Sequence, residues 1–242
     1  MATRGAADVG FFLIGGREFV GDLIDIKDAF ERVVEEITGL GAAVDSYQDL
    51  GMESLMIEVE GFLNEANDKS VEALGLTGTQ VLLYAPVGNV IGRDFIGGNL
   101  LRGSFSKIPT QHQLTKVQAS WKSSEQEEGV VLAPHTSRTS ATAQLASHNH
   151  GAAGTNGGVG YVACSALTLG GYTNLNVKIQ DSADDSAWAT YIDFTNLTAA
   201  NNTQRKTESS NPDQYSRVLF TWNGSGSGES AVVAVGFEAT PA

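Results

Sequence analysis

The sequence predicts a mainly β protein made of two consecutive β-rich halves, and three observations lead to this prediction. Short runs rich in β-branched and aromatic residues recur along the chain, separated by clusters of Gly, Asn and Asp, as in strands and turns. Hydrophobic residues make up 41% of the 242 residues and charged residues 18%, which is a globular composition. Residues 134–158 are polar, carry a single charge at Arg138 and lack hydrophobic periodicity, so we expect a linker or long loop there.

The first half, residues 1–133, contains one strand that the sequence defines well, SLMIEVEGF. Apolar and polar residues alternate along it, so one face is expected in the core and the other outside. The residues of the apolar face are Leu55, Ile57 and Val59. Two glutamates, Glu58 and Glu60, lie on the opposite face. The runs TQVLLYAPVG and KVQASW also suit strands.

The segment DIKDAFERVVEEITGLG, which precedes this strand, carries a different pattern. Its apolar residues recur at helical spacing: Ile26, Phe30, Val33 and Ile37. Gly39 or Gly41 could serve as a C-terminal stop of a helix. Periodicity alone therefore predicts a helix here.

The second half, residues 159–242, reads as an antiparallel β-sandwich. Five short apolar runs, GYVACSALTL, LNVKIQ, ATYIDF, SRVLFTW and AVVAVGF, are separated by turn residues. Between the second and third runs lies DSADDSA, which lacks the Gly and Glu that a calcium loop needs. Its adjacent carboxylates, Asp184 and Asp185, would diverge rather than face each other across a cleft. We therefore predict a turn there, with Trp188 starting the return strand as a core residue.

No group of residues in the sequence indicates catalysis, a metal or a cofactor. Cys164, the only cysteine, lies on the apolar side of a strand and is expected to be a packed thiol. His148 and His150 stand in a Gly/Ala/Ser-rich segment, where solvated side chains are the usual outcome and a weak metal site is the alternative. We expect neither an enzyme nor a cofactor-binding protein.

The charge of the chain argues against nucleic-acid binding. The net charge is −13, and residues 17–72 carry fifteen Asp or Glu against four Lys or Arg, a balance that repels phosphates. No apolar run approaches the roughly 20 residues that span a bilayer, so no membrane association is expected. The apolar run FFLI is too short for a secretory signal, which favours a protein made and kept in a cytoplasm.

Residues 33–65, VVEEITGLGAAVDSYQDLGMESLMIEVEGFLNE, resemble the N-terminal part of major tail tube proteins of long-tailed bacteriophages, through an acidic E-x-T-G-x-G stretch and a strand ending in Glu-Gly-Phe. The second half is similar to the C-terminal part of tail proteins of the same group, through GGVGYVACSALTLGG, VKIQDSADDSAW, YIDFTNLTAA and DQYSRVLFTWNGSGSGESAVVAVGF. The chain departs from that pattern in QYSRVLF and in the long polar stretch NNTQRKTESSNPD, which we expect to be a loop.

The resemblance implies a tail-tube-type β-barrel or sandwich domain with an extended N-terminal arm, followed by the second β-sandwich. It also implies that FERVVEEI is a strand, which we favour over the helix because inter-strand pairing overrides local periodicity. Subunits would form rings, hexamers or three-copy pseudo-hexamers, that stack into a tube in the virion, made in the cytoplasm of a bacterial host. DNA would pass through without specific binding, and tape measure and terminator proteins would be further partners.

Specific residues follow from this resemblance. Glu58 and Glu60 are candidates for an acidic face toward the lumen, with outer glutamates as the alternative. The candidate ring-stacking residues, in the N-terminal arm and the 64–78 segment, are Asp8, Phe11, Glu65 and Asp68.

The alternative function is a surface-displayed carbohydrate-binding sandwich that serves in adhesion or decoration. The aromatic residues that would stack on a sugar are Trp188, Tyr191 and Trp222.

Overall fold

The computed structural model describes residues 2–5, 9–19, 23–36, 47–62, 79–108, 116–123 and 126–239. Within these ranges the protein is all-β, which confirms the predicted fold class. The strands before residue 140 are Ala2–Gly5 (β1), Phe11–Ile14 (β2), Arg17–Glu18 (β3), Leu23–Glu36 (β4), Tyr47–Phe62 (β5), Gln80–Ala85 (β6), Asp94–Ile108 (β7), Lys116–Ser123 (β8) and Gln126–Arg138 (β9). The later strands are His148–Asn149 (β10), Gly158–Thr168 (β11), Asn174–Ser182 (β12), Ala189–Asp193 (β13), Asn202–Glu208 (β14), Tyr215–Asn223 (β15) and Ser230–Ala239 (β16). These ranges hold no helix that could cross a membrane.

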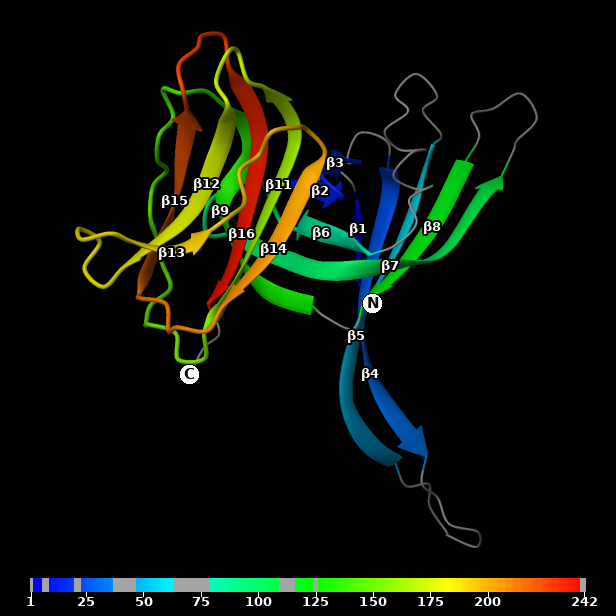
Figure 1. The fold of residues 1–242 in the computed structure, drawn as a ribbon. Coiled ribbons are helices and arrows are strands. Elements are labelled where there is room, and N and C mark those ends of the chain that lie inside the picture. The colour runs from blue at the N-terminus through cyan, green and yellow to red at the C-terminus, as the bar shows by residue number, and fades with distance from the viewer. Residues whose placement is uncertain are drawn as a thin grey trace, which may run out of the picture.

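The strands form two antiparallel sheets (Figure 1). The larger sheet has twelve strands, and its main path runs β1-β4-β5-β8-β7-β9-β16-β11-β14. Three further strands join it off this path, since β6 pairs with both β7 and β2, and β2 pairs with β3. The smaller sheet has the order β10-β15-β12-β13. Because β7 pairs with β8 and with β9, one continuous sheet runs through both halves of the chain.

The short run FFLI forms a layer with β6 that is buried on both faces. On one face, the side chains of Phe12 and Ile14 pack in a cluster with β4, β5 and β8. On the other face, Phe11 and Leu13 pack in a cluster with Val131 of β9 and with Tyr161 and other residues of the second half. All four residues of β2 are inaccessible to solvent. A strand buried on both faces needs a continuous apolar run rather than an alternating one, which accounts for this sequence.

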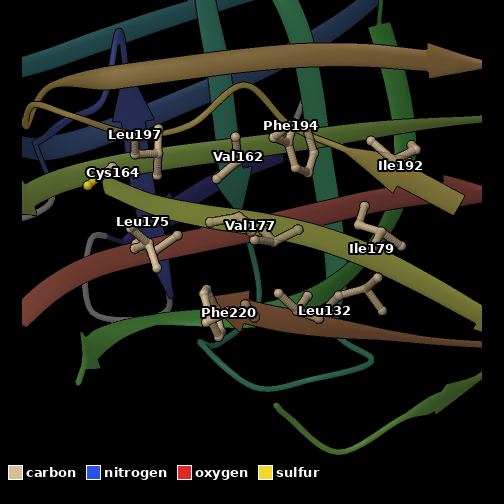
Figure 2. Packing of buried hydrophobic residues seen from close by; sticks show 14 of the residues in the cluster. Leu132, Val162, Cys164, Leu175, Val177, Ile179, Ile192, Phe194, Leu197 and Phe220 are labelled. Carbon is tan, nitrogen blue, oxygen red and sulfur yellow. The ribbon is translucent and has the colours of Figure 1, made fainter. Parts of the chain in front are cut away.

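The second half is the predicted β-sandwich. The smaller sheet packs on the sheet formed by β9, β16, β11 and β14, and the space between them is filled by aliphatic and aromatic side chains (Figure 2). Val177 and Ile179 of β12 face Val162 and Phe194 there. Cys164 lies in the same cluster, which confirms the packed thiol, and burial raises its pKa to about 11. At ordinary pH it is therefore a protonated, poorly nucleophilic thiol.

The segment 134–158 is not a linker between two separate bodies. The predicted boundary at residue 133 falls inside β9, which pairs with β7 at one end and with β16 at the other. Further along the segment, β10 pairs with β15 and Gln144 forms a bridge with Leu219. His135 is buried and lies 2.8 Å from the Ser165 hydroxyl. The segment lacks hydrophobic periodicity because it runs along sheet edges, where few of its side chains enter the core.

One further sequence prediction was wrong, and the ambiguity between helix and strand is settled in favour of the strand. Residues 23–36 form strand β4 rather than a helix, because the backbone pairs with β5 along its length. The polar stretch after Ala200 contains β14, an edge strand that pairs only with β11 in the main path of the sheet. Polar and charged residues suit such an edge, since they discourage pairing with other chains. The predicted stop at Gly39 or Gly41 lies outside the described residues.

The connection between β12 and β13 is the turn that its aspartates predict. One carboxylate oxygen of Asp184 accepts hydrogen bonds from the backbone N–H groups of Ser186 and Ala187, at 3.0 and 2.9 Å. These bonds hold the pKa of Asp184 well below its usual range. Asp185 has φ of 59°, a left-handed conformation that Asp tolerates better than most residues. Trp188 starts the return strand, but it is only half-buried and is not a member of the core cluster.

Candidate functional site

The candidate site is the polar face of strands β4-β5-β8-β7, which form one part of the larger sheet. The alternation predicted for β5 is confirmed, since the side chains of Leu55, Ile57 and Val59 are buried in the core cluster of this half. Glu58 and Glu60 lie at the alternate positions and are partly exposed. The sheet therefore has one dry face, packed on the β2–β6 layer, and one polar face that bears both glutamates.

Cross-strand pairing brings other polar residues beside the two glutamates. Glu58 stands opposite Ser120, which stands opposite Ser104, and the two serine hydroxyls are 2.8 Å apart. In the next polar row, the amide of Gln118 donates to the Glu60 carboxylate at 3.3 Å. Serines and a glutamine thus flank the two glutamates on the β8 and β7 side, whereas on β4 Lys27 stands opposite Glu58 and Asp25 opposite Glu60.

A shallow hollow of about 190 Å³ lies on this face. Residues from β5, β7 and β8 line it: Glu58, Val59, Glu60, Ser104, Ser106, Gln118, Ala119 and Ser120. Its only charged residues are the two glutamates, so the hollow offers a negative, hydrogen-bonding surface to an approaching solute. Phosphate groups would be repelled by such a surface rather than held by it.

The serines and the glutamine of this face were not identified from the sequence. A signal for them was present on β8, because Gln118, Ser120 and Lys122 alternate with apolar residues in KVQASWKS. On β7 the signal is weaker, since glycines interrupt the strand. One of these, Gly97, is required by packing, because a Cβ there would lie 2.6 Å from the Tyr161 ring.

The polar face lies between two strand edges that, in the described part of the chain, are open over part of their length. On one side, β7 pairs with β8 over residues 101–108, whereas β6 and β9 reach only Leu100 and Gly98 of β7. On the other side, β1 pairs with β4 only over residues 25–28. Beyond the end of β8, β4 and β5 continue as a two-stranded ribbon that extends away from the rest of the molecule (Figure 1). Both edges are therefore available to strands of another chain.

Only one of the four predicted ring-stacking residues, Phe11, lies in the described part of the chain. Phe11 is fully buried between the two halves, where its ring lies 6.1 Å from that of His135, so it has no surface at which to contact another ring. The prediction failed for Phe11 because its strand is an inner layer and not part of an arm. Asp8, Glu65 and Asp68 lie outside the described residues.

The three aromatic residues of the alternative sugar-binding prediction do not form one platform. Tyr191 is buried, and its hydroxyl donates to the Ser210 carbonyl at 2.6 Å. The Trp188 ring is covered by the guanidinium of Arg217, at 4.1 Å from the ring centroid. Trp222 packs partly against the sandwich core, 5.7 Å from the ring of Tyr172. Positions 217 and 222 of β15 point to opposite faces of their sheet, which separates the two tryptophans.

His148 of β10 and His150, just after it, lie close together, with ring centroids 4.8 Å apart. His150 also packs against the ring of Phe237, at 5.6 Å. Burial, and then the charge of His148, lower the pKa of His150 to about 4, so it is neutral at ordinary pH. The prediction that these histidines are solvated was wrong for His150. No group of three or more His, Cys, Asp or Glu in the described ranges could hold a metal ion.

A buried charged cluster joins the two halves. Glu127 of β9 is 9% exposed, accepts a hydrogen bond from the Tyr161 hydroxyl and forms an ion pair with Arg205 of β14. Arg205 also donates from Nε to the Tyr161 hydroxyl at 3.0 Å. Burial and Glu127 hold the pKa of Tyr161 far above its usual range, so it remains a phenol that donates. Glu238 of β16 lies near this cluster, and burial together with the charge of Glu127 raises its pKa to about 7.

We expect Glu238 to make folding stability depend on pH. Near pH 4 the Glu238 carboxyl is protonated in both the folded and the unfolded chain. Between about pH 4.5 and pH 7 it is ionised in the unfolded chain but still protonated in the folded chain, so the free energy of unfolding falls as the pH rises. Glu238→Gln cannot ionise and should unfold at a higher denaturant concentration than the wild type at pH 8. Because the carboxyl is half-exposed, the gain is on the order of 1 kcal/mol, and it should vanish near pH 4. Urea titrations at both pH values measure this difference.

Asp185→Asn is the matched control for Glu238→Gln, since it removes one charge from an exposed position whose left-handed backbone also suits Asn. The control should not reproduce the pH-dependent gain. An equal gain for both variants would mean that net charge is responsible, rather than the surroundings of Glu238.

No protein-family model matches the chain, and no curated protein sequence matches it. Among solved structures, it is similar to a chain from the tail of an empty GTA particle with C6 symmetry, at TM-score 0.34 and 10% identity over 45% of this chain and 81% of that one. It is also similar to a chain from the virion of a native gene transfer agent particle, at TM-score 0.37 and 9% identity over 52% and 98%. A third is the SPP1 Dit protein, described as a paradigm of the hub adsorption apparatus in phages infecting Gram-positive bacteria, at TM-score 0.35 and 8% identity over 94% and 98%. At these TM-scores, inference of function rests on the residues of this chain.

Proposed function

We propose that this chain is a structural subunit of a phage-type virion tail, which assembles into rings that stack as a tube for the passage of DNA. The observation that carries the proposal is the sheet β4-β5-β8-β7, which has, in the described ranges, one polar face, an open edge on β7 and an edge on β4 that only β1 covers, over residues 25–28. The resemblance of residues 33–65 to tail tube proteins supports the same function. Tail proteins such as the tape measure and terminator would be partners of the assembled tube.

The strand directions of this sheet suit closure into a ring. Each neighbouring pair is antiparallel, so β4 and β8 run one way and β5 and β7 run the other. If the β7 edge of one subunit meets the β4 edge of the next, that pair is antiparallel as well. The contact is heterologous, from one edge to the other, and a heterologous contact closes into a ring when the rotation between subunits allows it. A closed sheet leaves no edge exposed.

The amino-acid sequences of the two edge strands also differ in charge. Residues 101–108 of β7 contain Arg102 and Lys107 and no acidic residue. In β4, Leu23–Glu36, five acidic residues stand against two basic ones. Complementary charge favours the β7-to-β4 contact over β4-to-β4 or β7-to-β7 contacts, because like charges placed together are repelled.

In such a ring the polar face, with Glu58 and Glu60, would line the lumen. The opposite face is covered by the hydrophobic core of the subunit, so only the polar face can face the lumen. Repeated around a ring, the glutamates would give a negative wall that does not hold phosphate. DNA would then pass without specific binding.

Electron microscopy of the purified protein at rising concentration tests this proposal. We expect rings or short tubes, and light scattering should give a mass that is a multiple of the subunit. The double variant Arg102→Glu/Lys107→Glu should assemble only at higher protein concentration, because it puts like charges on both edges. Arg93→Glu, a charge reversal at an exposed turn residue, is the control. Single subunits of the wild type at every concentration would refute the proposal.

A further inference from the structure

Strand β1 occupies part of the edge that the proposed ring needs. It consists of Ala2–Gly5 and pairs antiparallel with β4, with Ala2 opposite Asp28 and Gly5 opposite Asp25. It lies at the end of the main path of the sheet and has β4 as its only strand partner in the described ranges (Figure 1). The stretch of β4 that β1 covers is thus closed to any other strand.

The covered stretch lies level with the open edge of β7. Asp25 is opposite Glu60, Glu60 opposite Gln118, and Gln118 opposite Ser106 of β7. Two residues further along β4, Lys27 is opposite Glu58, Glu58 is opposite Ser120, and Ser120 is opposite Ser104 of β7. A second subunit that offers its β7 edge at the same level would therefore meet β1 first.

Strand direction decides whether β1 stays on β4 or leaves it when a second subunit arrives. Because β1 is antiparallel to β4, it runs in the same direction as β7. If β1 stayed in place, the incoming β7 would pair with it in parallel, over four residues at most. If β1 left, β7 would pair with β4 in the antiparallel sense, over up to the eight residues of 101–108 that are open. The second pairing is longer and has the more stable geometry.

We propose that β1 is a removable cap on the β4 edge, which the β7 strand of a second copy of this chain displaces when subunits join. The inference rests on the proposed function, since the second copy is the neighbour in the ring. Arg4 is the only charged residue of β1, whereas β7 brings Arg102 and Lys107 to the acidic strand. The exchange thus increases both the backbone pairing and the charge complementarity on β4. A single subunit keeps its edge closed until a neighbour takes the place of β1.

A reversible covalent lock on β1 tests the cap. Thr3 and Lys27 stand directly opposite each other in the β1–β4 pair. Opposite residues of an antiparallel pair have Cα atoms about 4.5–5.5 Å apart, a distance that a disulfide can bridge. The oxidised variant Thr3→Cys/Lys27→Cys should stay as single subunits at concentrations where the wild type forms rings, and a reductant should restore assembly. The native Cys164 is buried and does not compete for the bridge.

The matched control introduces a disulfide at a position that does not involve the β4 or β7 edge. Asn174 and Asn223 are opposite each other in the β12–β15 pair, and their side chains are joined by a hydrogen bond of 2.6 Å. Asn174→Cys/Asn223→Cys should assemble equally well when oxidised and when reduced. Equal assembly of the oxidised and reduced β1-locked variant, with the control also assembling, would overturn the cap and leave the ring intact.

A second variant approaches the cap from the other side. Deletion of residues 1–5 removes β1, so rings should form at a lower protein concentration than with the wild type. Loss of rings after this deletion, while the wild type forms them, would overturn the cap, because β1 would then be part of the ring contact. Failure of the wild type and of every variant to assemble would instead refute the proposed function, and the cap with it.

Discussion

The variant Glu58→Lys/Glu60→Lys should bind double-stranded DNA where the wild type does not. The double substitution replaces two negative charges by two positive ones on the polar sheet face, in a hollow whose other lining residues are uncharged. Lysines on this face would contact phosphates and release counterions, which the wild-type surface cannot do. The effect is expected already in single subunits, since both side chains are partly exposed there.

Fluorescence anisotropy of a labelled DNA duplex, measured at several salt concentrations, checks this expectation. The lysine variant should bind with an affinity that falls as salt rises, with a slope of about −0.9 for each phosphate contacted. Glu58→Gln/Glu60→Gln is the control that removes the charge without reversing it, and it should bind much more weakly. Tight binding of DNA by the wild type at moderate salt would contradict an acidic wall that lets DNA pass.

Arg205→Leu should strongly destabilise the junction of the two halves. The guanidinium is the ion-pair partner of Glu127, whose carboxylate is buried and also accepts the Tyr161 hydroxyl hydrogen bond. Without Arg205, a buried negative charge would remain uncompensated, at a cost of about 3 kcal/mol in the free energy of unfolding. Urea unfolding should show the midpoint moving to a lower concentration, for the second half and the β2–β6 layer together.

The double variant Glu127→Gln/Arg205→Leu separates the charge effect from lost packing. Because glutamine is neutral and nearly isosteric, it can still accept the Tyr161 hydroxyl, so the double variant should be more stable than Arg205→Leu alone. Additive losses would mean that the two side chains stabilise the junction independently. In that case the ion pair is not what makes Arg205 important.

The alternation of apolar and polar residues was enough to predict β5 and its two faces, because one face of that strand is buried and the other is partly exposed to solvent. Runs rich in β-branched and aromatic residues predicted five strands of the sandwich, and the Asp and Ser residues between two of them predicted the turn built on Asp184. It did not identify β7, in which Gly97, Gly98 and Gly103 weaken the strand signal. The reason for at least one of these glycines is tertiary, since the ring of Tyr161 fills the place of the Gly97 side chain.

Other features depend on contacts between distant parts of the chain. In β4, residues at helical spacing form a strand because β5 pairs along them, so partner choice overrides the local pattern. The junction cluster brings together Glu127, Tyr161 and Arg205, which are separated by 34 and 44 residues in the sequence. No local pattern marks such a cluster. The placement of Phe11 was missed for the same reason, since its run was compared with a signal peptide and not with an inner strand.

The single strand β7 has a mechanical consequence for the molecule. Its fifteen residues pair with β9 of the sandwich wall at one end and with β8 of the polar sheet at the other. A strand held by hydrogen bonds on both sides of the junction transmits torque, so a tilt of the polar sheet turns the sandwich with it. The second half then acts as a lever arm, whose far end sweeps a longer arc than the sheet that drives it. In the ring that we propose, small rotations at the centre would thereby become large displacements at the periphery.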